Sequence, residues 1–341
     1  MTPEQWSLPV ALLAFASGAG ATVWGGVRLS TLGDILADRT RWGEALFGTV
    51  FLGAATSLSG LVMTAAAGLD GRAGLAYSNA AGGLAAQTAA LAVADLFYRH
   101  ANLEHAAASL FNMVSGVVLI MLLAVAVTLT FVPEVTIWNV HLGTPVLVGV
   151  YLFGITIMRG VGARPLWHPA RTAATRLDEP AQHPDTRTVR SLLLSFAAVA
   201  CVVSAGGWAV AEAAGARVER TAFTETQIGA LLMGVTNALP EAVVSVAAVR
   251  RGALTLAVAG IVGGNAFDVL NLAIGDVAFR QGSLYHTATD EQLVILLATM
   301  FMTAVIVAGQ LRREPAGPGR IGQESAIVLG VYGLVAVLIA T

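Results

Sequence analysis

Charged residues are scarce in this sequence, and what is missing narrows the class of protein. Only 12% of the 341 residues are charged, whereas 56% are hydrophobic and the mean hydropathy is +0.74. This composition excludes an ordinary soluble domain. A single cysteine, Cys201, excludes a disulfide framework. The N-terminal segment carries Glu4 and no basic residue before its apolar run, so it is not predicted to be a signal peptide.

What is present is a series of long apolar stretches, separated by charged residues or by proline and glycine. Most are long enough for a helix to cross the hydrocarbon core of a bilayer, which is about 30 Å thick and takes roughly 20 residues. The sequence therefore predicts an all-α polytopic membrane protein. The ten predicted transmembrane helices are at residues 8–27, 43–68, 73–98, 106–131, 136–158, 190–213, 224–249, 253–279, 291–311 and 323–340.

Lysine is absent, so arginine supplies all 19 strong cations and by itself predicts the orientation. Cytoplasmic loops of membrane proteins carry an excess of basic residues. With both termini outside, 15 of the 19 arginines fall on the cytoplasmic side, and the longest polar stretch, residues 160–189, becomes a cytoplasmic linker. We expect a multi-pass protein of the cell (inner or plasma) membrane. Its partners are then the lipid bilayer and inorganic cations or protons, with no nucleic acid, and the oligomeric state is not predicted.

The two halves of the chain are related by a shift of 181 residues. Residues 53–99 align without a gap on residues 234–280, and 15 of the 47 pairs are identical, including two adjacent glycines. An odd number of predicted helices, five, separates the copies, so the second copy is inverted in the membrane. Inverted repeats with polar breaks at mid-membrane are typical of secondary transporters. We predict two inverted five-helix repeats, residues 1–159 and 190–341, joined by the linker.

Both copies end in an acid followed four residues later by an arginine. Asp95 precedes Arg99, and Asp276 precedes Arg280. Residues four apart are neighbours on a helix surface. We expect both to be ion pairs at the membrane interface.

Pro240 and Glu241 stand together in the middle of the predicted helix at 224–249. Proline has no N–H and its ring crowds the preceding turn, so Pro240 frees the carbonyl of Thr236 from helical hydrogen bonding. A free carbonyl inside a membrane is tolerated where it lines a cavity or finds another partner, and a cation is such a partner. A charge at this depth costs a few kcal/mol unless a cation or proton meets it. Glu241 is therefore predicted to be a cation ligand.

A second polar group lies at the same depth in the predicted helix at 253–279. Gly263 and Gly264 are expected to loosen this helix just before Asn265 and Asp268, which are three residues apart and share a helix face. Carboxylate, amide and carbonyl oxygens suit hard cations, and carboxylates also carry protons. We expect Glu241, Asp268 and Asn265 to form a metal site.

These residues carry a resemblance to a known family. The segment "GVTNALPEAVVSVAAVRRG" (234–252), followed by "AGIVGGNAFDVLNL" (259–272), resembles the second α-repeat of the sodium/calcium exchanger superfamily, the calcium/cation antiporters. The family pattern is roughly G-T-S-L-P-E, then G-N-x-x-G-S-N-x-F-N or -D. The resemblance implies that Glu241 coordinates the cation, that Asn265 and Asp268 belong to the partner helix of the site, and that the predicted first and sixth helices slide past the rest. The -N-x-F-D ending is similar to the potassium-dependent members.

Other polar positions of the two copies are candidates for the same site. The further ion-binding candidates are Thr236, Asn237, Thr56, Ser57, Asn79 and Gln87. The alternative for small polar residues of this kind, and for Asn265, is that they join helices by hydrogen bonds.

The first copy departs from the family pattern in its acids. Ser59 stands on the proline position, Gly60 on the glutamate position, and Gln87 opposite Asp268. A further asparagine of the pattern is replaced by Leu84, and in the second copy the pattern is altered at Asn237, Ala238, Gly260 and Gly264. A Ca²⁺ site takes six to eight oxygens and enough negative charge to replace lost hydration. The missing acids therefore argue against ordinary Na⁺/Ca²⁺ exchange.

The sequence as a whole predicts a secondary-active cation antiporter that exchanges a cation against Na⁺ or H⁺ by alternating access. The transported ion is Na⁺, Ca²⁺, K⁺ or H⁺, and neither another cofactor nor enzyme activity is expected. The alternative is a non-transporting, sensor-like member of the same fold that binds an ion without turnover. A metal-dependent enzyme would need paired His and Glu ligands with an open position. The segment "HANLEH" (100–105) does not have the histidine spacing of the zinc motifs, and we predict it to be a loop at the membrane surface.

Overall fold

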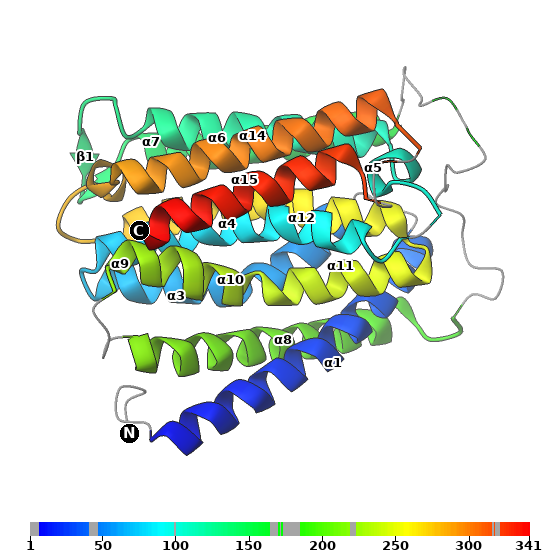
Figure 1. The fold of residues 1–341 in the computed structure, drawn as a ribbon, viewed down its shortest axis with the longest axis horizontal. Coiled ribbons are helices and arrows are strands. Elements are labelled where there is room, and N and C mark those ends of the chain that lie inside the picture. Colours follow the sequence, from blue (N-terminus) through cyan, green and yellow to red (C-terminus); the bar gives the residue numbers. More distant parts are fainter. Residues whose placement is uncertain are drawn as a thin grey trace.

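The computed structural model describes residues 7–40, 47–98, 100–163, 170, 172, 185–218, 223–315, 317 and 321–341. In these ranges the chain forms a bundle of helices with one short β-hairpin (Figure 1). The first part contains α1 (Leu8–Thr40), the π-helical turn η2 (Gly48–Leu52), α3 (Gly53–Leu69), α4 (Ala73–Asp95), α5 (Leu103–Ala106), α6 (Leu110–Thr128), β1 (Thr136–Ile137), β2 (Val140–His141) and α7 (Gly143–Ala163). The second part contains α8 (Val189–Val218), α9 (Glu225–Gln227), the π-helical turn η3 (Ile228–Met233), α10 (Gly234–Asn237), α11 (Leu239–Arg251), α12 (Leu254–Asp268), α13 (Leu270–Ala278), η4 (Leu284–Thr287), α14 (Asp290–Arg312) and α15 (Gln323–Ala340).

The helices match the predicted membrane spans closely. Within the described ranges, nine helical segments are long and apolar enough to cross a membrane. Each corresponds to one predicted span. The predicted span at 73–98 is the helix α4, whose 23 residues are mostly alanine, glycine and other small residues and are nearly all buried among other helices. The protein is therefore a multi-pass, all-helical membrane protein, as predicted.

Two predicted boundaries are wrong, each for a local reason. The first helix was expected to end at residue 27 but runs on to Thr40, because Leu29, Leu32 and Leu36 recur on one helix face and are buried. The fifth was expected to begin at residue 136 but begins at Gly143. Residues 136–141 form the hairpin of β1 and β2, whose two turn residues both have positive φ.

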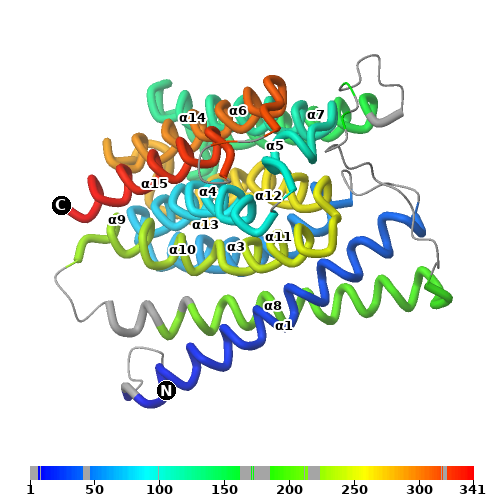
Figure 2. The backbone as a smooth tube through the Cα atoms, turned by 45° about the vertical axis from the view of Figure 1, so that its right-hand side comes forward, coloured from blue at the N-terminus to red at the C-terminus, as the bar shows by residue number. Residues whose placement is uncertain are grey.

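The helices form a buried centre flanked by more exposed helices. In both views, α1 and α8 lie along one side of the bundle and cross each other, whereas α6, α7 and α14 lie on the opposite side (Figures 1 and 2). The span of α12 and α13 between them is 83% buried over its most apolar window, whereas the corresponding windows of α1 and α8 are 28% and 33% buried. The polar residues of the central helices are thus shielded by protein, and α1 and α8 present most of their surface outward.

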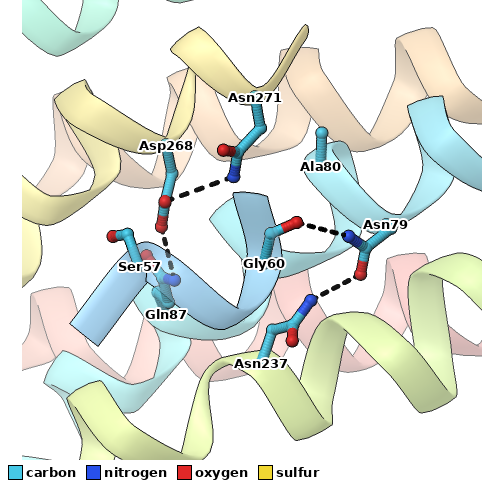
Figure 3. Close-up of a pocket in the computed structure, with 9 residues that line it drawn as sticks. Ser57, Gly60, Asn79, Ala80, Gln87, Asn237, Asp268 and Asn271 are labelled. Carbon is cyan, nitrogen blue, oxygen red and sulfur yellow. Dashed lines mark hydrogen bonds between the residues drawn. The ribbon is translucent and has the colours of Figure 1, made fainter. Parts of the chain in front are cut away.

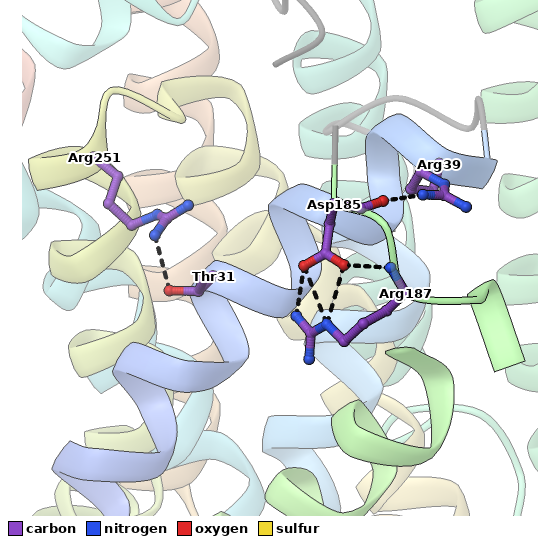
Figure 4. Close-up of polar contacts among 5 residues, drawn as sticks. All are labelled: Thr31, Arg39, Asp185, Arg187 and Arg251. Atoms are coloured by element: carbon purple, nitrogen blue, oxygen red, sulfur yellow. Dashed lines mark hydrogen bonds and ion pairs between the residues drawn. The ribbon is translucent and has the colours of Figure 1, made fainter. Parts of the chain in front are cut away.

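The bundle has two ends. We call the end where α7 ends and α8 begins the linker end, and the end where α1 begins and α15 ends the terminal end. At the linker end, Arg251 of α11 contacts α1 through Asp34 (Nη2 to Oδ2, 2.8 Å) and Thr31 (Nη1 to Oγ1, 2.8 Å) (Figure 4). Arg39 of α1 donates to the carbonyl of Asp185, just before α8. These bonds connect α1 both to the centre and to α8 at this end.

The central helices cross at unusually close range at two places, each through a glycine. A Cβ built on Gly263 would lie 2.3 Å from the Cα of Thr49, and one on Gly82 would lie 2.4 Å from the Cα of Ala230. The members of one pair are each 181 residues from a member of the other. The prediction that Gly263 and Gly264 loosen their helix is wrong, because α12 continues through both. Absence of a side chain, which lets two backbones meet, explains the glycine at 263.

Asp95 and Asp276 occupy equivalent corners at opposite ends of the bundle. The carboxylate of Asp95 accepts the backbone N–H of Leu103 (2.7 Å) and of Gly322 (2.9 Å) at the linker end. The carboxylate of Asp276 accepts the backbone N–H of Leu284 (2.9 Å) and of His141 (2.8 Å) at the terminal end. The expected ion pair of Asp276 with an arginine four residues on is replaced by these backbone bonds, and Arg99, the expected partner of Asp95, lies outside the described residues. Both acids join loops to helices.

Candidate cation-binding site

Two helix breaks meet at the middle of the bundle. The helix that begins at Glu225 is interrupted at Ala238 and begins again as α11, with Pro240 in its first turn. The helix that begins at Leu254 is interrupted at Val269, directly after Asp268. The break at Pro240 was predicted from the missing N–H. In the first copy, Ser59 keeps its N–H and α3 continues through this position.

The two acids of the broken helices are buried beside each other. Glu241 lies in the first turn of α11 with 2% of its surface exposed, and Asp268 ends α12 with 3% exposed. The two carboxyl groups are near enough for electrostatic repulsion. Neither faces the lipid side of the bundle. A buried pair of like charges requires a cation or protons to neutralise it.

Amide groups surround the carboxylate of Asp268. Gln87 of α4 donates its Nε2–H to Oδ2 (2.6 Å), and Asn271 of α13 donates its Nδ2–H to Oδ1 (3.2 Å) (Figure 3). A second pair lies across the same space, where Asn237 donates to the Oδ1 of Asn79 (2.5 Å). Asn79 in turn donates to the carbonyl of Gly60 (3.3 Å). Residues from both copies therefore meet around one centre.

These side chains line a small cavity with room for about one water-sized sphere. Its lining residues are Ser57, Gly60, Asn79, Ala80, Gly83, Gln87, Asn237, Asp268 and Asn271. They come from α3, α4, α10, α12 and α13. The cavity lies at the depth of both helix breaks, far from either end of the bundle.

Buried oxygens at the cavity have no hydrogen-bond donor. Four belong to residues that line it, and two more are the carboxylate oxygens of Glu241. The six are Ser57 Oγ, Gln87 Oε1, Asn237 Oδ1, Asn271 Oδ1, Glu241 Oε1 and Glu241 Oε2. A buried acceptor without a partner costs about 1–3 kcal/mol, so such groups are rare unless something else satisfies them. A cation is attracted to several oxygens that lack donors, and the amide N–H groups of the same residues already have acceptors.

The predicted ion-binding residues divide into two groups. Five line the cavity: Ser57, Asn79, Gln87, Asn237 and Asp268. The others do not line it: Glu241, Asn265, Thr236 and Thr56. Asn265 donates its Nδ2–H to Thr88 Oγ1 (2.7 Å) and faces α4. Thr56 donates to the carbonyl of Leu52 in its own helix (3.0 Å). Asn265 and Thr56 thus make the helix-joining bonds that were the alternative.

Sequence reasoning missed Asn271. It lies three residues after Asp268, the spacing at which two side chains share a helix face. That spacing was a usable signal. The resemblance drew attention instead to the motif, which ends at Asp268.

The corner at the linker end contains more acid than its counterpart. Segment "HANLEH" is not a surface loop, since its last part forms α5 and both Glu104 and His105 are 4% exposed. His105 contacts the carbonyl of Arg313 (2.5 Å) and the hydroxyl of Thr172 (2.7 Å), which occupy both ring nitrogens. Ser325 donates to Glu104 Oε1 (2.9 Å), and Oε2 of the same side chain has no donor. Glu104 is therefore a buried acid with only half of its hydrogen bonds.

Burial, and then the charge of Asp95, raise the pKa of Glu104 to about 7. An acid whose pKa is raised by folding stabilises the protein fully below its unfolded value of 4.5, and this contribution is lost as the pH rises through about 7. We expect Glu104→Gln to raise the melting temperature at pH 8 and to change it little at pH 5, with a difference on the order of a few kcal/mol. Thermal unfolding in detergent across this range measures it.

Glu314→Gln is the control, because Glu314 is a more exposed acid near the same end that pairs with Arg312. It should leave the pH dependence of the wild type unchanged. Equal pH dependence in Glu104→Gln and wild type would show that Glu104 does not titrate in this range.

Comparisons with known proteins agree with this geometry. Residues 191–341 match the family model described as sodium/calcium exchanger protein. The fold is similar to that of the sodium-calcium exchanger NCX_Mj soaked with 10 mM Na⁺ and 10 mM Sr²⁺, with a TM-score of 0.72 and 14% identity over 97% of this chain and 99% of that one. The structure of NCX_Mj soaked with zero Na⁺ and Ca²⁺ gives a TM-score of 0.69 and 14% identity over 97% and 100%. A search against curated protein sequences gave no match.

The sequence match covers the half of the chain that contains Pro240, Glu241 and Asp268, and the fold match covers nearly all of it. The resemblance inferred from the motifs is thus confirmed by two independent comparisons. The chain is a member of the sodium/calcium exchanger superfamily, a family of membrane transporters and not of enzymes.

Proposed function

We propose that this protein is a secondary cation antiporter that exchanges a cation against Na⁺ or H⁺ by alternating access. The observation that carries the proposal is the set of six buried oxygens without donors, gathered around a small cavity beside two acids at mid-depth. A cation held there would satisfy the oxygens and cancel the charge of Glu241 and Asp268. The cation is cargo, and no other cofactor is proposed.

The architecture we propose is ten transmembrane helices in two inverted five-helix repeats, residues 1–159 and 190–341, with residues 160–189 as a cytoplasmic linker. The corners of Asp95 and Asp276 support it, because their backbone donors also differ by 181 residues and lie at opposite ends of the bundle. The close crossings at Gly82 and Gly263 follow the same shift. We place both termini outside the cell membrane, from the distribution of the arginines.

In the mechanism we propose, the centre stays fixed while α1 and α8 move across it. Glu241 and Asp268 repel each other when both are charged and the cavity is empty, so a cation or protons must occupy the site before the helices move. Gln87 and Asn271 hold the carboxylate of Asp268 in place from two sides. The outward surfaces of α1 and α8 meet lipid, which resists sliding less than a packed core does.

The test is cation-dependent stability together with flux. A ligand that binds only the folded protein raises its apparent stability. We expect purified protein to gain thermal stability with at least one of Na⁺, K⁺ and Ca²⁺, and vesicles containing it to move that cation only when a counter-gradient of Na⁺ or H⁺ is imposed. A lack of coupled flux under any of these gradients would reject the antiporter.

A second candidate is a sensor-like protein that binds an ion without moving it. It is favoured by one observation, that both oxygens of Asp268 already accept amide N–H bonds. Gly60 and Gln87 in place of the acids expected from the family also reduce the charge available for a transported ion. Ion-induced stabilisation without any flux is the result this candidate requires.

A further inference from the structure

The room that a side chain at position 60 would occupy is filled by amides. A Cβ built on Gly60 would lie 3.5 Å from Nδ2 of Asn237 and 3.5 Å from Nδ2 of Asn271. Gly60 is the position at which the resemblance expects a glutamate. Figure 3 shows both amides approaching Gly60 from opposite sides. The site is therefore built with neutral groups where a third carboxylate would stand.

The charge at the centre can be counted from the described residues. Glu241 and Asp268 are the acids beside the cavity. The other buried acids of the described ranges are Asp95, Asp276, Glu104 and Glu324, which lie at the two ends of the bundle. No arginine of the described ranges is among the buried polar residues. The centre thus carries two negative charges when both acids are ionised.

The space at the centre admits one ion at a time. The cavity holds about one water-sized sphere, and amide side chains close the region around Gly60. A single divalent cation cancels two negative charges. Six oxygens without donors also meet the lower limit of the six to eight oxygens that a large divalent cation such as Ca²⁺ takes. A second cation has no room, so the returning site can become neutral only through protons, which bind the carboxylates themselves.

We propose that each cycle carries one divalent cation in one direction and two protons in the other, so that no net charge crosses the membrane, and that Asn271 sets this balance by being an amide. The inference rests on the proposed antiport function and specifies its coupling. A site that moved with an uncompensated charge would pay the cost of a charge in hydrocarbon. Protons leave the two carboxylates as the cation binds, so charge balances in both half-cycles.

The experiment uses the full-length protein in proteoliposomes with Ca²⁺ as the divalent probe. The membrane potential is set with K⁺ and valinomycin, and internal pH is followed with a trapped dye. We expect Ca²⁺ uptake driven by an acid interior, two protons released per Ca²⁺, and less than about a twofold change when the potential is altered. One net charge per cycle would instead change the equilibrium accumulation roughly 50-fold for every 100 mV.

Asn271→Asp adds a third carboxylate to the cavity and should make uptake depend on the potential, with a third proton per Ca²⁺. Asn139→Asp makes the same chemical change in the exposed β1–β2 turn and should leave uptake independent of potential. Wild-type uptake that depends on potential, requires Na⁺ or carries K⁺ in place of Ca²⁺ overturns the inference but leaves antiport intact. Absence of flux under every gradient overturns the antiport function itself.

Discussion

Glu241→Gln is expected to lower cation exchange at least about 100-fold while leaving the protein folded. The substitution keeps the size of the side chain but removes one of two charges that hold the ion, and breaking a buried charged interaction costs about 3–5 kcal/mol. Stability should not fall, because both oxygens of Glu241 lack donors and the residue is 2% exposed in the empty protein. Flux into proteoliposomes and the melting temperature in detergent measure the two effects separately.

The matched control is Glu225→Gln, the same change on the same membrane span. Glu225 lies at the terminal end, is partly exposed and pairs with Arg72 (Nε to Oε1, 3.1 Å). A partly exposed ion pair contributes about 0–1 kcal/mol, so this variant should keep flux within about twofold of wild type. Wild-type flux in Glu241→Gln would remove the basis of the proposed site.

Gly263→Ala should destabilise the protein by about 3 kcal/mol or prevent its folding. The new Cβ would lie 2.3 Å from the Cα of Thr49 and 2.5 Å from its Cβ, so η2 and α12 would have to separate. Overpacking of a close contact typically costs 1–3 kcal/mol, and backbone atoms cannot turn away as a side chain can. Thermal unfolding in detergent and the monodispersity of the purified protein measure the effect.

Gly149→Ala is the comparison, because a Cβ there meets no atom within 4 Å and the residue is exposed on α7. Alanine favours helix over glycine, so this variant should be as stable as wild type or more so. Gly82→Ala should behave like Gly263→Ala, since its Cβ would lie 2.4 Å from the Cα of Ala230. Increased stability in Gly263→Ala would mean that the glycine serves flexibility and not contact.

Much of the fold was readable from the sequence because its causes are local. Hydropathy over some 20 residues marks a membrane helix whatever surrounds it, so all ten predicted spans coincide with helices. The break before Pro240 follows from a missing N–H within one turn. Where prediction failed, the cause was also local but of another kind. The positive φ angles of Trp138 and Asn139 form a hairpin that hydropathy does not detect.

The site was only partly readable because its contacts join helices far apart in the chain. The sequence identified Glu241 and Asp268 by charge alone. It could not show that Gln87 donates to Asp268, since these residues are 181 positions apart and meet only when α4 packs against α12. Nor could it distinguish Asn265, which bonds to Thr88, from Asn271, which lines the cavity.

The sequence by itself determined that the chain lies in the membrane, where its helices run, how its halves repeat and which acids are too deep to be idle. The tertiary structure decided which polar atoms meet and which oxygens are left without donors. The physical reason is that burial and helix formation depend on neighbours within a few turns, whereas the geometry of the cavity depends on how closely distant backbones approach, which the glycine crossings at Gly82 and Gly263 set.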